Sequence, residues 1–231
     1  PLTTRPSPAR QAGFTLLEIT IAVTVLAMAM TLIVLTFSNI SRAWRDGTAA
    51  AAGLNHADAI LDQLSAGLRS AYYKKSGRGQ PSPYGFWLDN DGGGSTARDR
   101  ISWVKTGSAL VDPTQPEAGS LHRLTFTVED DDRGRPCAAI KLWRPFGQKE
   151  EFDPEREAPL FFLASGVVGF DCEVATNVDG FGSFEWETEW EETNRLPAHV
   201  HLTLFLKPGD PDREPLKVER IVSLPTAPLS W

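Results

Sequence analysis

The segment Ile19–Ser41 contains no charged residue and consists mostly of Ile, Val, Leu, Ala, Met and Thr. As an α-helix, these residues would extend about 35 Å, which is long enough to cross a bilayer. Arg5 and Arg10 precede the segment and Arg42 and Arg45 follow it, so positive charge alone does not set its orientation. This feature predicts a membrane-spanning helix, beside which the rest of the chain must fold.

Two ordinary explanations of such a segment fit the residues less well. A secretory signal peptide has a shorter apolar region that ends in a small-residue cleavage site. A plain signal anchor fits the length but gives no reason for Glu18 at the start of the apolar run. A carboxylate at the edge of a membrane is costly unless it is paired, so it normally marks a function.

The residues Gly13–Ile19 read Gly-Phe-Thr-Leu-Leu-Glu-Ile and follow a short basic leader. This arrangement resembles the processing site of type IV prepilins and of type II secretion pseudopilins. The resemblance implies that a prepilin peptidase cleaves between Gly13 and Phe14, on the cytoplasmic side, and methylates the new amino terminus. It also implies that Glu18 pairs with the terminal amine of a neighbouring subunit, because a buried ammonium group needs an opposite charge.

Beyond the apolar segment, the sequence predicts a helix that continues through about Tyr72 or Tyr73. Apolar residues recur there with a helical period, which predicts a stripe that packs on the protein's own globular domain. A Gly- and Pro-rich stretch, Ser76–Pro83, ends the helix. The stripe consists of two rows, Leu54, Leu61 and Leu68, and Ala57, Leu64 and Ala71.

Beyond Pro83 the pattern changes to short alternating segments between turns, which predicts strands. The expected fold class is therefore α+β, with a long N-terminal hydrophobic helix packed on an antiparallel β-sheet domain. The expected divisions are a leader (1–13), a transmembrane and assembly helix (14–75) and a β-rich globular domain (76–231). The predicted strands are Tyr84–Leu88, Ile101–Lys105, Leu121–Glu129, Cys137–Arg144, Leu160–Leu163, Val167–Ala175, Phe184–Glu189, His199–Lys207 and Lys217–Leu224, with a hairpin turn at Asp130–Gly134.

The C-terminal part has a Gly-Val element in Leu163–Phe170, a Trp-rich segment at Trp186–Trp190, a Leu-Pro step at Leu196 and a closing segment, Val218–Pro225. This order resembles the minor pseudopilin J of type II secretion systems. The resemblance implies a single-pass protein of the bacterial inner membrane, with its globular domain in the periplasm. Its implied partners are I-like and K-like minor pseudopilins and the major pseudopilin, at the tip of a pseudopilus that drives protein secretion.

Other candidate sites are weaker. Asp89 and Asp91 lie in a Gly-rich stretch with the alternation of a calcium loop, but the bidentate Glu is missing, so we expect a turn and no metal or other cofactor. His199 and His201 have a spacing that can hold zinc, but two exposed strand histidines are the better interpretation. Cys137 and Cys172 form either one disulfide or two small core residues.

The formal charge of −7 disfavours nucleic acid as a partner. No nucleophile elbow, phosphate-binding loop or metalloprotease motif is found, so we expect a structural subunit and not an enzyme. Two alternative functions stay open. One is a minor pilin of a type IV pilus, for adhesion, motility or uptake. The other is an anchored carbohydrate-binding module that stacks sugars on Trp186 or Trp190.

Overall fold

The computed structural model describes residues 15–74, 82–149, 151–175, 185–190, 195–208 and 213–225. The predicted leader and the predicted cleavage site at Gly13 and Phe14 lie outside these residues. The chain divides into two compact units, Pro1–Thr48 and Ala49–Trp231, and each is described by itself.

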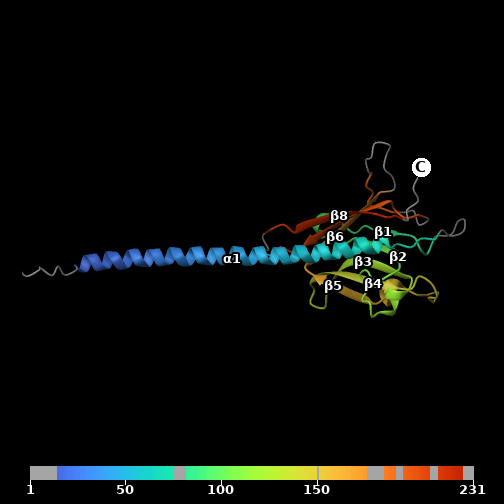
Figure 1. Cartoon of the computed structure of the whole chain (residues 1–231), viewed down its shortest axis with the longest axis horizontal. Coiled ribbons are helices and arrows are strands. Elements are labelled where there is room, and N and C mark those ends of the chain that lie inside the picture. Colours follow the sequence, from blue (N-terminus) through green and yellow to red (C-terminus); the bar gives the residue numbers. More distant parts are fainter. Residues whose placement is uncertain are drawn as a thin grey trace, which may run out of the picture. The chain divides into compact units, whose positions relative to one another are not determined.

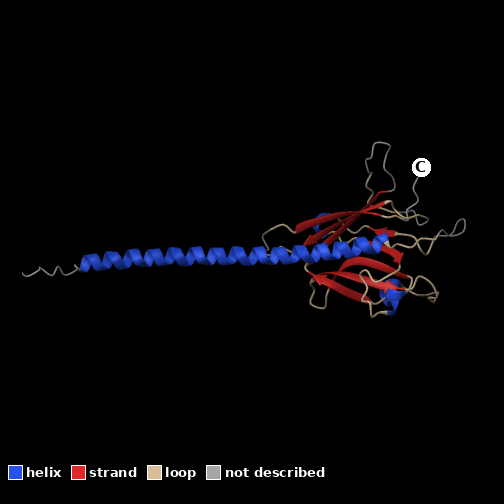
Figure 2. Cartoon of the chain, in the orientation of Figure 1, coloured by secondary structure: helices blue, strands red, loops and turns tan. Residues whose placement is uncertain are grey.

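One helix, α1 (Leu16–Arg69), accounts for 54 residues and includes the whole apolar segment (Figures 1 and 2). It is long and apolar enough to cross a membrane. It ends earlier than predicted, because the next residues pair with a strand instead. Ala71 forms a β-bridge with Lys105, and the backbone N–H of Tyr72 donates to the carbonyl of Val104 over 2.7 Å.

The part of α1 that belongs to the second unit is amphipathic, and its apolar stripe is buried as predicted. Within the described residues of that unit, the stripe packs against strands of both sheets in one hydrophobic core. Leu54 is the exception, since 37% of its surface is exposed. The buried residues of the helix are Ala57, Ile60, Leu61, Leu64, Ser65, Gly67 and Leu68.

The described residues of the second unit form two antiparallel sheets after the long helix, which confirms the α+β fold class. The first sheet has the order β1 (Trp87–Asp89), β2 (Arg100–Lys105), β3 (His122–Asp130), β4 (Pro136–Trp143) and β5 (Leu160–Ser165). The second has the order β6 (Val167–Ala175), β7 (His199–Leu206) and β8 (Leu216–Ser223). Short helices η1 (Gly94–Thr96), η2 (Pro116–Gly119) and α2 (Pro154–Glu157) lie in the connections.

The predicted hairpin between β3 and β4 is confirmed. The Asp131 carboxylate accepts hydrogen bonds from the backbone N–H groups of Arg133 and Arg135, each over 2.9 Å. Gly134 has a φ of 68°, a conformation that glycine adopts without strain. An aspartate side chain and a glycine therefore close the predicted turn, as is common in such connections.

The strand predicted at Phe184–Glu189 is wrong for its described part. Residues 185–190 form two isolated bridges instead, one between Glu187 and Val174 and one between Trp190 and Leu88. Trp190 is only 7% exposed and meets Phe86 edge to face, with 6.4 Å between ring centroids. The Trp-rich segment thus contacts an edge strand of each sheet, β1 and β6, without continuing either as a full strand.

Candidate assembly site

Glu18 lies in the first turn of α1, and its side chain is exposed. The residue before the helix, Thr15, caps that turn, since its Oγ1 accepts a hydrogen bond from the Glu18 backbone N–H over 3.2 Å. Thr15-Leu16-Leu17-Glu18 has the spacing of a capping box, in which Thr stands at N-cap and Glu at N3. A carboxylate at this position also interacts favourably with the helix dipole. Glu18 is therefore placed both to stabilise the helix start and to offer a negative charge to another molecule.

The apolar half of α1 leaves few polar groups to be satisfied from outside. Five hydroxyls in this stretch donate to a backbone carbonyl three or four residues earlier, at oxygen–oxygen distances between 2.6 and 2.9 Å. Such bonds let Ser and Thr enter a hydrocarbon environment, because they pair the hydroxyl donor within the helix. The residues concerned are Thr20, Thr24, Thr31, Thr36 and Ser38.

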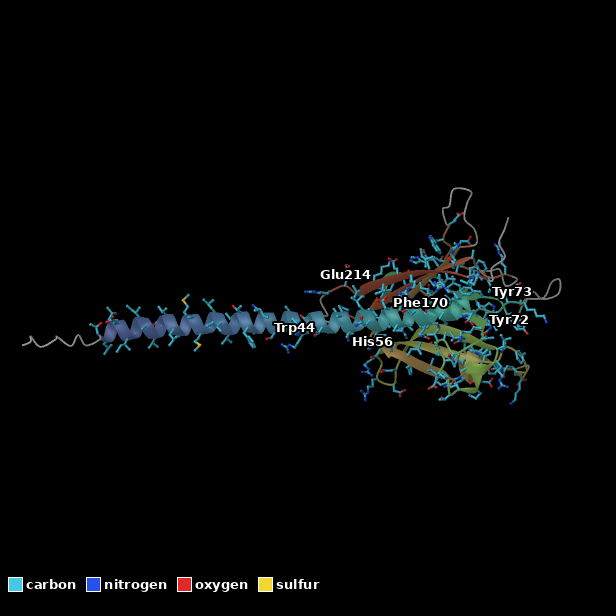
Figure 3. The ribbon with its side chains drawn as sticks, in the orientation of Figure 1. Trp44, His56, Tyr72, Tyr73, Phe170 and Glu214 are labelled. Atoms are coloured by element: carbon cyan, nitrogen blue, oxygen red, sulfur yellow. The ribbon has the colours of Figure 1, made fainter. Side chains whose placement is uncertain are left out.

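The apolar side chains of this half project on all sides of α1 (Figure 3). None of the described residues before Thr48 is buried within the chain. Trp44, next to Arg42 and Arg45, is 74% exposed. An aromatic ring flanked by cationic residues at the end of an apolar helix is typical of the membrane–water interface. The geometry fits a helix whose apolar surface is covered by lipid or by neighbouring helices.

Cys137 and Cys172 are both buried and both free, so the structure shows two core thiols and no bridge. Cys137 belongs to β4 in the first sheet, whereas Cys172 belongs to β6 in the second. Complete burial holds the pKa of the Cys172 thiol well above its ordinary value. Of the two alternatives left open by the sequence, this arrangement matches the pair of core residues.

Asp89 and Asp91, the candidate calcium ligands, have other roles in the structure. Asp89 ends β1, and the backbone N–H of Asp91 donates to Oδ1 of Asp99 over 2.9 Å. Oδ2 of Asp99 accepts from the N–H of Cys172 over 2.8 Å, so this carboxylate ties the loop to β6. Among the described residues, no group of three His, Cys, Asp or Glu side chains is placed to hold a metal ion.

Asp99 is fully buried, although it lies between two arginines in a charged stretch of the sequence. Burial raises the pKa of its carboxyl group, the two backbone N–H donors lower it, and the nearby Asp171 raises it. Its position depends on backbone groups far along the chain. The charged sequence around it, Arg-Asp-Arg, gives no sign of this.

His199 and His201 lie on the outer face of the second sheet and bind different partners. Nδ1 of His201 is 2.9 Å from Oε2 of Glu173, and its Nε2 is 3.4 Å from Oε1 of Glu219. Nδ1 of His199 is 3.0 Å from Oγ of Ser223. The sequence did not indicate a carboxylate near these histidines. The structure places two, those of Glu173 and Glu219, beside His201.

The structure separates the two tryptophans proposed as a sugar platform. Trp190 is buried in the core, so its ring has no face for a sugar. Trp186 is half-buried, and its ring centroid lies 5.3 Å from that of His201. At most one of the two rings can serve the carbohydrate-binding alternative.

Sequence patterns also missed two almost completely buried cations, Lys105 and Arg123. Lys105 donates from Nζ to the carbonyl of Gly107 over 2.7 Å, and its Nζ lies 3.3 Å from Nε2 of His122. Burial lowers the pKa of Lys105 to about 8. On the opposite face of the sheet, Arg123 donates to the carbonyls of Pro83 and Gly85 and lies 3.8 Å from the Trp87 ring centroid.

The prokaryotic N-terminal methylation motif matches residues 8–34 of the chain. The match includes Gly13, Phe14 and Glu18 and continues into the apolar half of α1. No curated protein matches the chain in sequence. The matched motif and the long apolar helix that follows it support a type IV pilin-like protein.

Proposed function

We propose that this chain is a minor pseudopilin, J-like in subtype, which acts by assembling with other subunits at the tip of a type II secretion pseudopilus. The methylation motif and the one apolar helix of membrane-spanning length among the described residues support a pilin-like subunit anchored in the bacterial inner membrane. The order of sequence elements from Leu163 to Pro225, which resembles that of minor pseudopilin J, supports the finer subtype. On this proposal the globular unit lies in the periplasm, and the chain performs no catalysis.

The observation that carries the proposal is the exposed carboxylate of Glu18, inside the methylation motif and one turn into α1. Cleavage after Gly13 would leave Phe14 as the first residue, four positions before this carboxylate. Within the described residues, Glu18 has no ion-pair partner, so its charge is available to another subunit. An ammonium group buried between helices would pair with it and fix the axial register of assembly.

The stability of this helix start can be separated from the charge of Glu18 by three variants. Glu18→Gln keeps a residue suited to the capping box but removes the charge. Glu18→Val removes both, and Thr15→Ala removes the cap but keeps the charge. We expect both Glu18 variants to be processed normally yet to lose most of their incorporation into pseudopili, measured as the fraction of the chain in sheared fibres.

Thr15→Ala is the matched control, and we expect it to assemble, because loss of a helix cap costs only about 1 kcal/mol. If Glu18→Gln is incorporated as well as the unchanged chain, the charge has no role in register. If Thr15→Ala fails as severely as Glu18→Val, the motif acts through helix stability and not through an ion pair.

The subtype is tested by co-purification. The full chain, extracted in a mild detergent, would be captured together with the I-like and K-like subunits of the same source. A stable complex of the three supports the J-like assignment. If the folded chain joins neither partner, the assignment moves to a minor pilin of a type IV pilus.

A further inference from the structure

The two sheets have four edge strands, and three of them are protected in ways that proteins commonly use. β1 has three residues and is bridged by Trp190 through Leu88. β6 is bridged by Arg98 at Phe170 and by Glu187 at Val174. β8 carries Lys217 and Glu219, which are charges that discourage pairing with another chain.

The fourth edge, β5, lacks such protection. Its sequence, Leu-Phe-Phe-Leu-Ala-Ser, contains no charge and no proline. Within the described residues, no bridge joins its outer side to another segment. Three large apolar side chains are exposed on it, namely Leu160 (39%), Phe162 (45%) and Leu163 (36%). An unpaired apolar edge of this kind is a template for an added strand.

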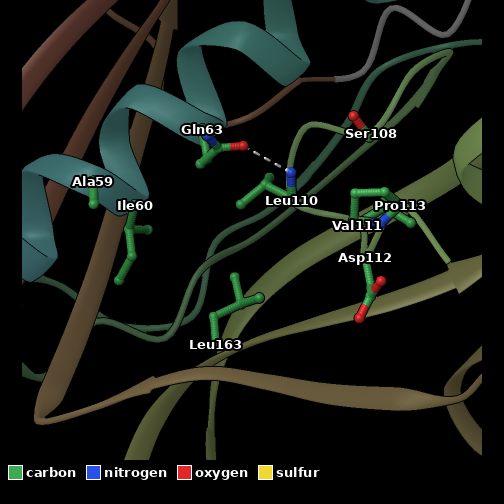
Figure 4. Close-up of a pocket in the computed structure, with 9 residues that line it drawn as sticks. All are labelled: Ala59, Ile60, Gln63, Ser108, Leu110, Val111, Asp112, Pro113 and Leu163. Atoms are coloured by element: carbon green, nitrogen blue, oxygen red, sulfur yellow. Dashed lines mark hydrogen bonds between the residues drawn. The ribbon is translucent and has the colours of Figure 1, made fainter. Parts of the chain in front are cut away.

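An open groove of about 540 Å³ lies beside this edge (Figure 4). Leu163 of β5 forms one wall, Ile60 and Gln63 of α1 form another, and Leu110 lies in the connection between β2 and β3. The groove is mostly apolar, and its volume is suited to side chains of a partner segment.

The backbone of Leu110 is held in a strained conformation at this groove. Its φ is 63°, and it is the one non-glycine residue with positive φ in the described part of the chain. Oε1 of Gln63 accepts a hydrogen bond from its backbone N–H over 3.2 Å (Figure 4). Strain in a bulky residue persists only where neighbouring contacts impose it, and it gathers at sites that clamp a ligand.

The residues that line the groove also indicate which charge a partner should carry. Asp112 lines it, and no Lys or Arg is among the lining residues. Hydrogen bonds from the hydroxyl and backbone N–H of Thr114 hold the pKa of Asp112 below its ordinary value. Its carboxylate is therefore charged at neutral pH, and a basic residue is its natural complement.

We propose that β5 accepts an extended segment of a partner subunit as an added strand. That segment places an apolar side chain in the groove beside Leu163 and a Lys or Arg against Asp112. Backbone hydrogen bonds along β5 provide affinity, while the groove and the carboxylate provide selectivity. The inference deepens the assembly role proposed above and rests on it, by naming the chemistry of a partner and the surface that receives it.

The test uses the full chain in nonionic detergent and three labelled ten-residue peptides of alternating Val and Thr. One peptide is flanked by Lys, one by Glu, and one has Lys flanks and two central prolines. We expect the Lys-flanked peptide to bind about tenfold more tightly than the Glu-flanked one, and the proline peptide not to bind. Hydrogen exchange should slow at residues 160–165 and stay unchanged at 216–223.

Two variants locate the contact. Phe162→Lys places a charge on the edge strand, so it should weaken binding of the Lys-flanked peptide about tenfold. Phe146→Lys is the matched control, because Phe146 is similarly exposed (55%) but lies outside β5. Asp112→Asn should remove most of the preference for Lys over Glu flanks while leaving exchange protection along β5.

The proposal is overturned if no peptide binds, if protection appears away from β5, or if Lys and Glu flanks bind equally. It is also overturned if the chain alone forms dimers through β5, which would make a second copy the occupant. Neither the peptides nor these variants involve Gly13 or Glu18. Failure here would therefore leave the proposed assembly role intact, and failure of the Glu18 experiment would not alter peptide binding.

Discussion

The two parts of α1 have opposite relations to the rest of the chain. Up to Thr48, the helix is largely apolar and its described residues are not buried. From Ala49 to Arg69 it carries charged residues as well, yet seven of its residues are buried in the core of the second unit. The period of the apolar residues separates the parts, since one is apolar on all sides and the other along a stripe.

This difference indicates what covers the apolar surface of each part. An amphipathic stripe is matched by an apolar surface of the same chain, here the inner faces of both sheets. A helix that is apolar on every side needs a surrounding that the chain does not provide, such as lipid or other subunits. The comparison therefore predicts that similar substitutions have different consequences in the two parts.

The largest expected effect comes from removing a buried leucine. Leu64→Ala should lower the free energy of unfolding of the second unit by about 2–5 kcal/mol, because Leu64 is fully buried and its removal leaves a cavity. The measurement is chemical denaturation of the full chain in nonionic detergent, followed by tryptophan fluorescence.

Leu32→Ala is the control in the apolar part, where Leu32 is 57% exposed. It should leave the unfolding of the second unit within about 0.5 kcal/mol of the unchanged chain. Equal losses in the two variants would break the comparison, since they would show that both parts contribute to one folded core.

A smaller effect is expected at two glycines of the amphipathic part. A Cβ added at Gly67 would lie 3.2 Å from Cζ2 of Trp103, and that ring is held in place because its Nε1 donates to the Gly67 carbonyl. We expect Gly67→Ala to lower the free energy of unfolding by about 1–3 kcal/mol through overpacking.

Gly53→Ala should instead stabilise the second unit by up to about 1 kcal/mol, because alanine favours the helix and the added Cβ meets only Leu206, at 3.9 Å. The same denaturation measurement distinguishes the two variants. If Gly67→Ala is also stabilising, the helix does not approach β2 as closely as the structure shows.

The smallest expected effect is a pH dependence at His122. Burial lowers the pKa of this histidine, and the charge of Lys105 lowers it further, while the carbonyl of Ser120 and the carboxylate of Glu117 oppose the shift. Because the unfolded chain binds a proton more readily, stability should be retained above the ordinary pKa of about 6.5 and fall as the pH decreases below it.

Unfolding of the full chain between about pH 7.5 and pH 5 measures this loss, and His122→Gln should reduce it. His199→Gln controls for the other histidine whose burial lowers its pKa. If stability depends on pH in the same way with and without His122, then protonation of this histidine does not affect folding.

The sequence predicted the features that depend on local pattern. Apolar residues at a helical spacing identified the buried stripe, and alternation identified most strands of both sheets. The Thr-x-x-Glu spacing at Thr15 was also readable as a capping box, and the prediction of Glu18 as an assembly residue overlooked it. A local rule was therefore available for the second role of that residue.

The missed features depend on contacts between distant segments. The buried carboxylate of Asp99 accepts hydrogen bonds from the backbone N–H groups of Asp91 and Cys172. No sequence pattern near Asp99 indicates these contacts. Trp190 lies among glutamates in the sequence but packs on Phe86. The unprotected edge at β5 likewise follows only from the strand order, because any apolar strand can be central or peripheral.

The central claim is that the apolar part of α1 remains in the mature protein as its membrane anchor, directly after a processed leader. Intact-mass spectrometry of the chain purified from membranes tests it. The account predicts loss of the residues through Gly13 and one added methyl group on Phe14, with the apolar helix retained. A chain cleaved beyond Ser41, as after a secretory signal, or one that keeps its leader, would contradict it.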